Sequence, residues 1–365
     1  MKRKLIKSMK NFKLETETVK AILCAFLAAL FYAVNIPISK LLLDSVGPTT
    51  MAALLYLGAG IGVGIMALFK TGGRNNSAPL SRRDMPFVIG MIALDIAAPI
   101  LLMLGIRHGS PANASLLGNF EIVATAVVAL LFFKEAVSIR LWTAIALITA
   151  ACAILSFEGG ESLRFSYGSL LVLLATVCWG FENNCTRRIS SKSTYEIVIL
   201  KGLFSGLGAL AIAFAKREPM PGLVPICEAM ILGFVAYGLS IFLYVRAQNT
   251  LGAAKTSAYY AVAPFAGALL SFAILGDRLS WMFLAALAIM AAGAVLVVSD
   301  TLIKHHTHLH SHIFSHCHGG TLHEHTVAHS HVHDHCMSME KHTHKHPLAQ
   351  LEKYVKEEQP GPMKI

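Results

Sequence analysis

Ten apolar stretches, separated by short polar links, run through residues 19–299 of the chain. A helix of about 20 apolar residues crosses the hydrocarbon core of a bilayer. The predicted spans are 19–43, 48–69, 86–105, 111–133, 139–157, 168–188, 194–215, 225–245, 253–275 and 280–299. Inside lipid, only helices and closed barrels satisfy every backbone hydrogen bond, so we expect an all-α polytopic membrane protein with ten transmembrane helices.

The distribution of Lys and Arg predicts how these spans are oriented. With the N-terminus inside, the N-terminal segment and the cytoplasmic links hold 18 of these residues, and the opposite links hold six. Cytoplasmic loops are enriched in Lys and Arg, so we expect both termini in the cytoplasm and the protein in the cell membrane. The basic start is not read as a signal peptide, because the apolar stretch that follows is too long and no small-residue cleavage site follows it.

The chain is similar to itself. AALFYAVNIPISK (28–40) aligns with ATVCWGFENNCTR (175–187), and VATAVVALLFFKEAVSIRLWTAIALI (123–148) aligns with PFAGALLSFAILGDRLSWMFLAALAI (264–289). In the second alignment Glu135 meets Asp277, so a charged turn recurs after the fourth and the ninth stretch. Five helices per unit is an odd number, so the second unit enters the membrane from the opposite side. This predicts an inverted repeat, a common plan of membrane carriers.

These motifs resemble the drug/metabolite transporter superfamily, in its EamA branch. The resemblance is carried by FYAVNIPISK and CWGFENNCTR, and by the acidic turns FFKEAVSIRLW and LGDRLSWMFLAALAIMAAG. It covers roughly residues 20–300 and implies two five-helix halves around a central cavity. It also implies alternating-access movement of small organic solutes, often outward. Pro264 fits a proline that the family often has in the ninth helix, whereas the first unit has Ile122, preceded by Glu121.

We expect five segments on this basis. They are a basic cytoplasmic N-terminus (1–18), a first repeat (19–157), a second repeat (168–299), a His-rich cytoplasmic tail (304–346) and a C-terminal tail (347–365). The family does not require the His-rich tail.

Composition supports a membrane protein and excludes several other classes. The chain is 55% hydrophobic and 14% charged, against about 25% charged residues in soluble domains. The net charge of +10 comes from Lys and Arg at the ends of apolar stretches, which does not form a nucleic-acid-binding face. The seven cysteines do not suggest a disulfide framework. We find no phosphate-binding glycine loop and no enzyme motif, so we expect no enzymatic activity.

Charged residues inside the apolar stretches are the candidate transport residues. A charge at the bilayer centre costs about 2.5–3.5 kcal/mol, so such residues usually face protein, water or a ligand. Glu121 is the first candidate, as a proton-coupling group or a cation ligand; the alternative is a structural acid, paired with Lys201. Glu182 has Arg187 and Arg188 as alternative partners. The full candidate set is Glu121, Asp95, Glu182, Lys201, Asn35, Asn183 and Trp179.

The tail gathers nearly all of the histidines. Of 17, all but His108 lie in residues 304–346. Neutral imidazole is a common ligand of zinc, nickel, cobalt and copper. The candidate metal ligands are His305, His306, His308, His310, His312, His316, His318, His323, His325, His329, His331, His333, His335, His342, His344, His346, Cys317 and Cys336. The segment lacks a helical period and a core, so we expect it to be disordered.

The sequence therefore predicts a secondary transporter of a small organic metabolite or drug-like solute, with a cytoplasmic metal-binding tail. Two alternatives stay open. One is a transition-metal transporter loaded from the tail, and the other is a membrane sensor or scaffold that transports nothing. We expect a small-molecule substrate, the lipid bilayer and transition-metal ions as partners, and a homodimer is compatible with the sequence.

Overall fold

A computed structural model describes most of the chain. The described residues are 2–69, 80–133, 138–158, 164–189, 192–251, 256, 259–276, 279–301, 303–318 and 321–336. The chain forms two compact units, Met1–Asp300 and Thr301–Ile365. Between residues 301 and 336 the structure describes the backbone.

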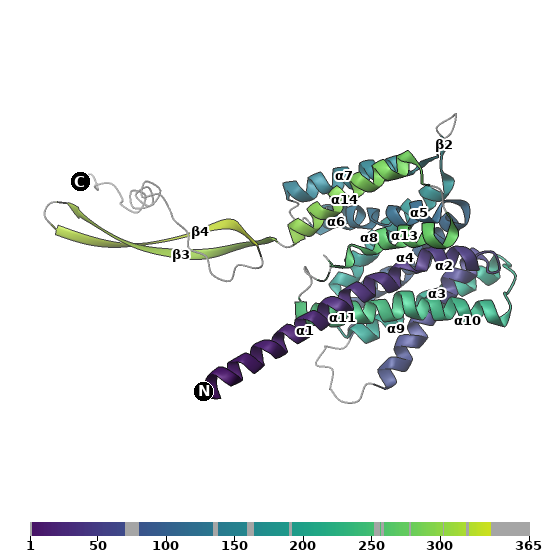
Figure 1. Cartoon of the computed structure of the whole chain (residues 1–365), viewed down its shortest axis with the longest axis horizontal. Helices are drawn as coiled ribbons and strands as arrows, with labels where there is room; N and C mark the ends of the chain where they lie inside the picture. Colours follow the sequence, from purple (N-terminus) through teal and green to yellow (C-terminus); the bar gives the residue numbers. More distant parts are fainter. Residues whose placement is uncertain are drawn as a thin grey trace. The chain divides into compact units, whose positions relative to one another are not determined.

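The first unit is a bundle of helices (Figure 1). Its first half contains α1 (Lys2–Ala33), α2 (Asn35–Leu42), α3 (Pro48–Leu68), η1 (Arg82–Asp84), α4 (Met85–His108), α5 (Pro111–Leu117), α6 (Phe120–Phe133) and α7 (Ile139–Leu155). Its second half contains α8 (Tyr167–Arg188), α9 (Thr194–Ala215), α10 (Leu223–Gly233), η2 (Phe234–Leu239), α11 (Ser240–Leu251), α13 (Ala263–Leu275) and α14 (Trp281–Thr301). The short strands β1 (Phe157–Glu158) and β2 (Arg164–Phe165) pair between the halves.

Seven helical segments of the described residues are long and apolar enough to cross a membrane. They are Glu17–Leu42, Pro48–Leu68, Arg82–His108, Pro111–Phe132, Tyr195–Ala215, Leu223–Ala247 and Trp281–Asp300. Two further apolar helices, Ile139–Leu155 and Ala263–Leu275, are shorter. The 22-residue α8 matches the sixth predicted span but is not among the seven; Glu182, Asn183 and Asn184 lie near its end. The protein is a multi-pass membrane protein, and ten crossings stay a prediction.

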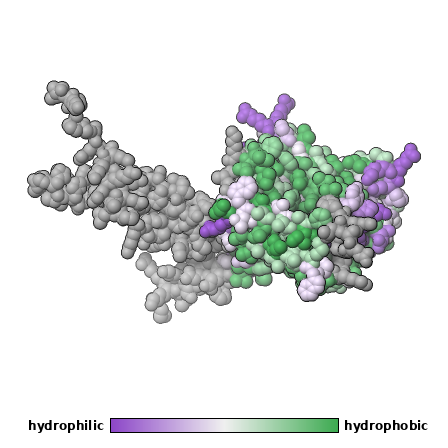
Figure 2. Space-filling model, turned by 90° about the horizontal axis from the view of Figure 1, so that it is seen from above, coloured by the Kyte–Doolittle hydropathy of each residue, from purple (hydrophilic) through white to green (hydrophobic). Residues whose placement is uncertain are grey.

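The surface of the bundle fits a lipid environment. Large apolar side chains stand outward, among them Leu68 (84% exposed), Leu269 (70%) and Trp281 (86%). Figure 2 shows a broad apolar face with hydrophilic residues gathered toward its edges. Water would make such extensive apolar exposure costly, whereas lipid tails solvate it.

The two halves of the bundle pack against each other through four pairs of helices. α3 lies along α9, α4 along α8, α1 along α11, and α5 against α13. The sequence repeat equates α1 with α8, α3 with α9, α4 with α10 and α11, and α5–α6 with α13. Exchanging the halves in this way maps these four contacts onto themselves, since α4 with α8 becomes α11 with α1.

Glycines permit the closest of these contacts. Gly60 of α3 and Gly202 of α9 face each other, and a Cβ added at Gly202 would lie 2.5 Å from the Cα of Gly60. Likewise, a Cβ at Gly180 of α8 would lie 2.5 Å from the Cβ of Ala124 in α6. Small residues that let helix backbones approach are the usual means of packing inside lipid, where no hydrophobic effect drives helices together.

Several helices are interrupted within the bundle. The first breaks at Val34, three residues before Pro37, which cannot donate a backbone hydrogen bond to Ala33. Another breaks at Gly118 and Asn119, between α5 and α6. A turn at residues 261–262 precedes α13, with Pro264 in its first turn. The breaks before α6 and before α13 therefore occupy corresponding positions of the two repeats.

The link between α9 and α10 caps another helix. The Glu218 carboxylate accepts hydrogen bonds from the backbone N–H groups of Thr49 (3.2 Å) and Thr50 (2.9 Å), and from the Thr50 hydroxyl (3.0 Å). These groups begin α3, whose own N-cap residue, Gly47, has no side chain to serve them. Burial opposes the charged carboxylate, but these hydrogen bonds outweigh burial and hold the pKa of Glu218 below its usual value.

We predict that Gly202→Ala destabilises the bundle. The added methyl group meets the backbone of α3, and overpacking of this kind costs about 1–3 kcal/mol. The measurement is the melting temperature of the detergent-solubilised protein. Gly64→Ala is the control, because a Cβ there meets nothing within 4 Å. Equal melting temperatures of the two variants would contradict a close α3–α9 contact.

We predict that Glu218→Gln lowers the melting temperature, by a loss of about 1–2 kcal/mol typical of a removed helix cap. Because the folded-state pKa is depressed, the advantage of the wild type is complete above about pH 4.5 and disappears as the pH falls further. The exposed Glu228→Gln is the control. A difference between Glu218→Gln and wild type that is independent of pH would argue against a charged cap.

Candidate functional site

A charge cluster of Asp95, Glu182 and Lys201 lies where α4, α8 and α9 meet. The Lys201 ammonium is 3.3 Å from Asp95 Oδ2 and 2.9 Å from Glu182 Oε1. Asp95 is completely buried and Glu182 is 2% exposed. Asp95 belongs to the first half of the chain and the other two to the second, so this ion pair connects the halves.

Hydrogen bonds extend the charge cluster to α3. Tyr56 donates to Asp95 Oδ1 at 2.9 Å, and Trp179 Nε1 donates to the Tyr56 hydroxyl at 3.5 Å. The Thr186 hydroxyl donates to Glu182. Asp95 Oδ2 accepts no hydrogen bond from the side chains that the structure describes, and faces the ammonium of Lys201. A buried carboxylate oxygen in this state is held mainly by the charge of its partner.

Glu121 forms a second centre beside the first. It lies in the first turn of α6, directly after the break at Gly118 and Asn119. Asn183 Nδ2 donates to Glu121 Oε1 at 2.7 Å and to the Thr125 hydroxyl at 3.2 Å. Glu121 is partly exposed, and it interacts electrostatically with Glu182 and Lys201. The positive end of the α6 dipole favours a negative charge at this position.

Helix α8 serves both centres. Glu182 and Asn183 follow Trp179 by three and four residues, so both lie on the same side of the helix as Trp179. Glu182 faces Lys201, while Asn183 reaches across to Glu121. Gly180 brings the α6 backbone close enough for the second contact.

A row of five tyrosines crosses the bundle and ends at the charge cluster. Ring centroids are 5.2 Å apart for Tyr244 and Tyr260, 6.0 Å for Tyr260 and Tyr32, 5.8 Å for Tyr32 and Tyr237, and 5.4 Å for Tyr237 and Tyr56. Tyr237 lies in η2, a π-helical turn of a kind often found at functional sites. Its hydroxyl accepts a hydrogen bond from Asn35 Nδ2 at 3.0 Å.

The structure thus brings all seven candidate transport residues into one connected region. Asn35 joins it through Tyr237, and Trp179 through Tyr56. Of the alternatives raised above, the described side chains show an ion pair of Glu182 with Lys201 and a hydrogen bond from Asn183 to Glu121. The tyrosine row was not predicted. A tyrosine in the middle of an apolar span would have signalled it, because its hydroxyl needs a partner there.

The region contains more acidic than basic side chains. Three carboxyl groups, those of Asp95, Glu182 and Glu121, share the single ammonium of Lys201 among the described side chains of the site. With every group ionised, the region carries two uncompensated negative charges. Lipid cannot screen them, so the arrangement favours binding of protons or of a cation.

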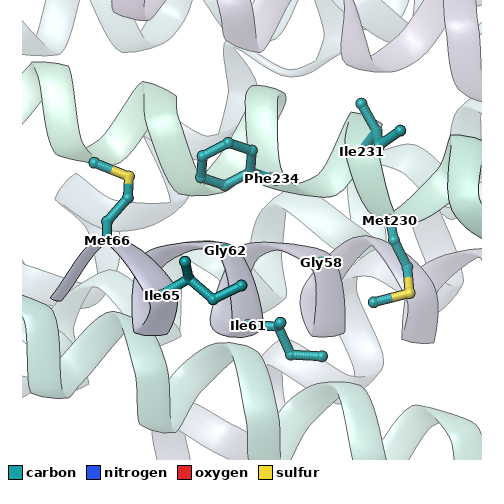
Figure 3. Close-up of a pocket in the computed structure, with 8 residues that line it drawn as sticks. All are labelled: Gly58, Ile61, Gly62, Ile65, Met66, Met230, Ile231 and Phe234. Atoms are coloured by element: carbon teal, nitrogen blue, oxygen red, sulfur yellow. The ribbon is translucent and has the colours of Figure 1, made fainter. Parts of the chain in front are cut away.

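An apolar groove of about 280 Å³ lies elsewhere, between α3 and the α10–η2 segment (Figure 3). Gly58, Gly62 and Ile65 line one side, and Ile231 and Phe234 the other. Ile65 and Ile231 are more than half exposed. The described residues that line the groove are all apolar, and none of them belongs to the site.

The tail forms a β-hairpin over most of its described length. β3 (Ile303–His318) pairs antiparallel with β4 (Thr321–Cys336). The expectation of disorder is wrong for these two segments. A histidine at every second position suits metal binding, but it also has the two-residue side-chain period of a β-strand. His342, His344 and His346 lie outside the described residues, as do residues 347–365 and the acidic turns at Glu135 and Asp277.

Comparison with known proteins identifies the family. The EamA-like transporter family model matches twice, at residues 19–157 and 166–299. The chain belongs to the EamA-like transporter family. It is 23% identical over 276 residues to an uncharacterized transporter of Methanothermobacter thermautotrophicus, covering 70% of this chain and 79% of the relative. It is 23% identical over 288 residues to the uncharacterized transporter YyaM of Bacillus subtilis, covering 75% and 90%.

A solved crystal structure of a protein has the same fold as this EamA-like chain. The TM-score is 0.57 with 16% sequence identity, and the match covers 77% of this chain and 96% of the other. The resemblance inferred from the repeated motifs is therefore confirmed at the level of the family. The transporter class is common to the family and to both named relatives.

We predict that Lys201→Met destabilises the protein strongly, by about 3–5 kcal/mol, because it leaves buried carboxylates without their counter-charge. Adding Asp95→Asn to this variant restores part of the loss. Melting temperature in detergent measures both effects. The control is Lys20→Met, whose partner Glu17 lies 2.9 Å away in α1 with both side chains more than half exposed; exposed pairs contribute about 1 kcal/mol or less. Equal effects of the two lysine variants would contradict the assigned cluster.

Proposed function

We propose that this EamA-like protein is a secondary transporter that exports a small organic metabolite or drug-like solute by alternating access. The observation that carries the proposal is the charge cluster, which lies in the bundle and joins its two halves. A buried ion pair between two bodies resists their separation, and a change of charge on either side weakens it. Such a contact suits a step in which the halves rearrange around a bound solute.

The two halves would be inverted repeats. The self-mapping set of contacts supports this, as do the matching breaks before α6 and α13. Interrupted helices in corresponding positions of two repeats commonly mark the binding site of a carrier. Ten crossings would then place both termini in the cytoplasm, in agreement with the distribution of Lys and Arg.

Glu121 would couple transport to protons. It is the carboxylate of the region that has an amide rather than an ammonium as its nearest described partner, so its charge is the least compensated. Proton binding there removes one of the two excess charges and alters the field at Glu182 and Lys201. A proton entering from one side of the membrane and leaving on the other would drive the solute against its gradient.

The tail would bind zinc, nickel, cobalt or copper on the cytoplasmic side, as a buffer or sensor for the metal. Neutral imidazoles bind all four metals, and the segment concentrates sixteen of them. This role does not require metal to be the cargo.

Transport of a transition-metal ion is the second candidate function. The excess of carboxylates and the His-rich tail favour it. Lys201 argues against it, because its ammonium already occupies the position between Asp95 and Glu182 that a divalent cation would take. Organic solute transport is therefore the better-supported proposal.

Reconstituted proteoliposomes test the function. A thermal-shift screen of purified protein against metabolites and metals first selects a solute. We predict that Glu121→Gln retains solute counterflow but loses at least tenfold of the accumulation driven by a proton gradient, since the amide cannot carry the proton. Glu196→Gln, an exposed carboxylate in α9, is the matched control. Gradient-driven accumulation equal to wild type in Glu121→Gln would refute the coupling role.

Metal transport is judged in the same vesicles. Radiolabelled nickel or zinc is offered to wild type and to a variant lacking residues 304–346. Metal flux that depends on the tail would favour the second candidate, and organic solute flux without metal flux would favour the first.

A further inference from the structure

The register of the tail hairpin orders the histidines in a way that composition does not reveal. Antiparallel pairing sets His306 opposite His333, His308 opposite His331, His310 opposite His329, and His316 opposite His323. Four histidines of one strand thus stand at the same level as four of the other. Residues directly opposite in an antiparallel pair have Cβ atoms about 4.5–5.5 Å apart.

Alternation along each strand adds a second kind of order. Successive residues of a strand belong to opposite faces, so positions two apart share a face. The register matches even-numbered residues of β3 with odd-numbered residues of β4. Twelve of the sixteen tail histidines therefore belong to one face of the ribbon, which we name the imidazole face: His306, His308, His310, His312, His316, His318, His323, His325, His329, His331, His333 and His335.

This arrangement depends on the pairing. A slip of one residue would move all the histidines of one strand to the other face, since the side-chain period is two. Gly319 and Gly320, which join the strands in the sequence, are a preferred dipeptide for two-residue hairpin connections. The loop length therefore favours the register that gathers the histidines.

The opposite face has a different composition. His305 belongs to it, at the level of Asp334, and so do both cysteines, with Cys317 opposite Leu322 and Cys336 opposite Ile303. The hairpin register thus separates the two thiols from the imidazole face. Sequence alone had grouped Cys317 and Cys336 with the histidines as ligands.

We propose that the imidazole face is the part of the tail that binds transition-metal ions, because its register places histidines of both strands at the same levels. This inference rests on the proposed metal binding by the tail. Zinc in closed sites takes four ligands in a tetrahedron. His306, His308, His331 and His333 occupy two neighbouring levels near the open end of the hairpin, and His316, His318, His323 and His325 occupy three levels near its connection. The ladder of directly paired histidines is interrupted where His312 stands opposite Val327 and Phe314 opposite His325.

Two quadruple variants with the same change in composition test the proposal. One replaces a set on the imidazole face by serine, His306, His308, His331 and His333. The other replaces the four tail histidines that are not on that face, His305, His342, His344 and His346. Full-length protein, purified without an added polyhistidine tag, is equilibrated with zinc, and the bound metal is counted by mass spectrometry.

The wild type and the second variant should bind the same number of zinc ions at micromolar free metal, and the first variant fewer. An equal loss of bound zinc in both variants would contradict the role of the imidazole face. It would favour a tail in which every histidine contributes equally to metal binding. Absence of zinc binding by the wild type would instead refute the proposed metal binding itself, so the two failures are distinguishable. Neither result depends on transport.

A variant of unchanged composition gives an independent test. His329 exchanges places with Ser330, His331 with Val332, and His333 with Asp334, which moves three histidines to the other face. We expect the zinc count to fall below that of the wild type, as in the first quadruple variant. A count equal to that of the wild type would overturn the assignment to one face, because the number and spacing of the histidines hardly change.

Discussion

The structure depends on one buried contact, the ammonium of Lys201 between Asp95 and Glu182. In lipid, a charge without a partner costs several kcal/mol, and water is not present to replace a lost partner. The contact therefore constrains α4, α8 and α9 at once, and with them the two halves of the chain. Neighbouring side chains add hydrogen bonds to this contact. Tyr56 donates to one oxygen of Asp95, Trp179 donates to the Tyr56 hydroxyl, and Thr186 donates to Glu182. The same contact is the one whose strength would change when a proton or a charged solute arrives.

The sequence was sufficient to identify the family, the membrane-protein class and a set of polar residues that the fold brings together. Charged residues in apolar stretches are rare enough that Asp95, Glu121, Glu182 and Lys201 were recognisable without a structure. It was insufficient to pair them. From the sequence, Lys201 could equally have formed an ion pair with Glu121, and Glu182 with Arg187. Which pairs form depends on the rotation of each helix and on its depth in the membrane. Those quantities follow from contacts such as Gly60 with Gly202, which are properties of two segments far apart in the chain.

Two features were missed for different reasons. The tyrosine row was hidden because tyrosine is compatible with an apolar span, so Tyr32, Tyr237 and Tyr260 attracted no notice as a group. The hairpin was missed because the His-x-His pattern was interpreted as chelating chemistry, although the same pattern has the period of a strand. In both cases the interpretation considered the chemistry of the residue type and overlooked what its positions along the chain imply for the fold. The glycine pair at the hairpin connection carried the missing information.

The polarity of α8 has a consequence for how the protein is made. Helices enter the bilayer from the translocon one after another, and each is partitioned by its own affinity for lipid. With Glu182, Asn183 and Asn184 near its end, α8 is a weak candidate for spontaneous entry, yet it begins the second half. Its hydrogen-bond partners in the first half, Tyr56 of α3 and Glu121 and Thr125 of α6, are synthesised earlier. If α8 crosses the membrane as the sequence predicts, its entry would depend on these contacts with the first half.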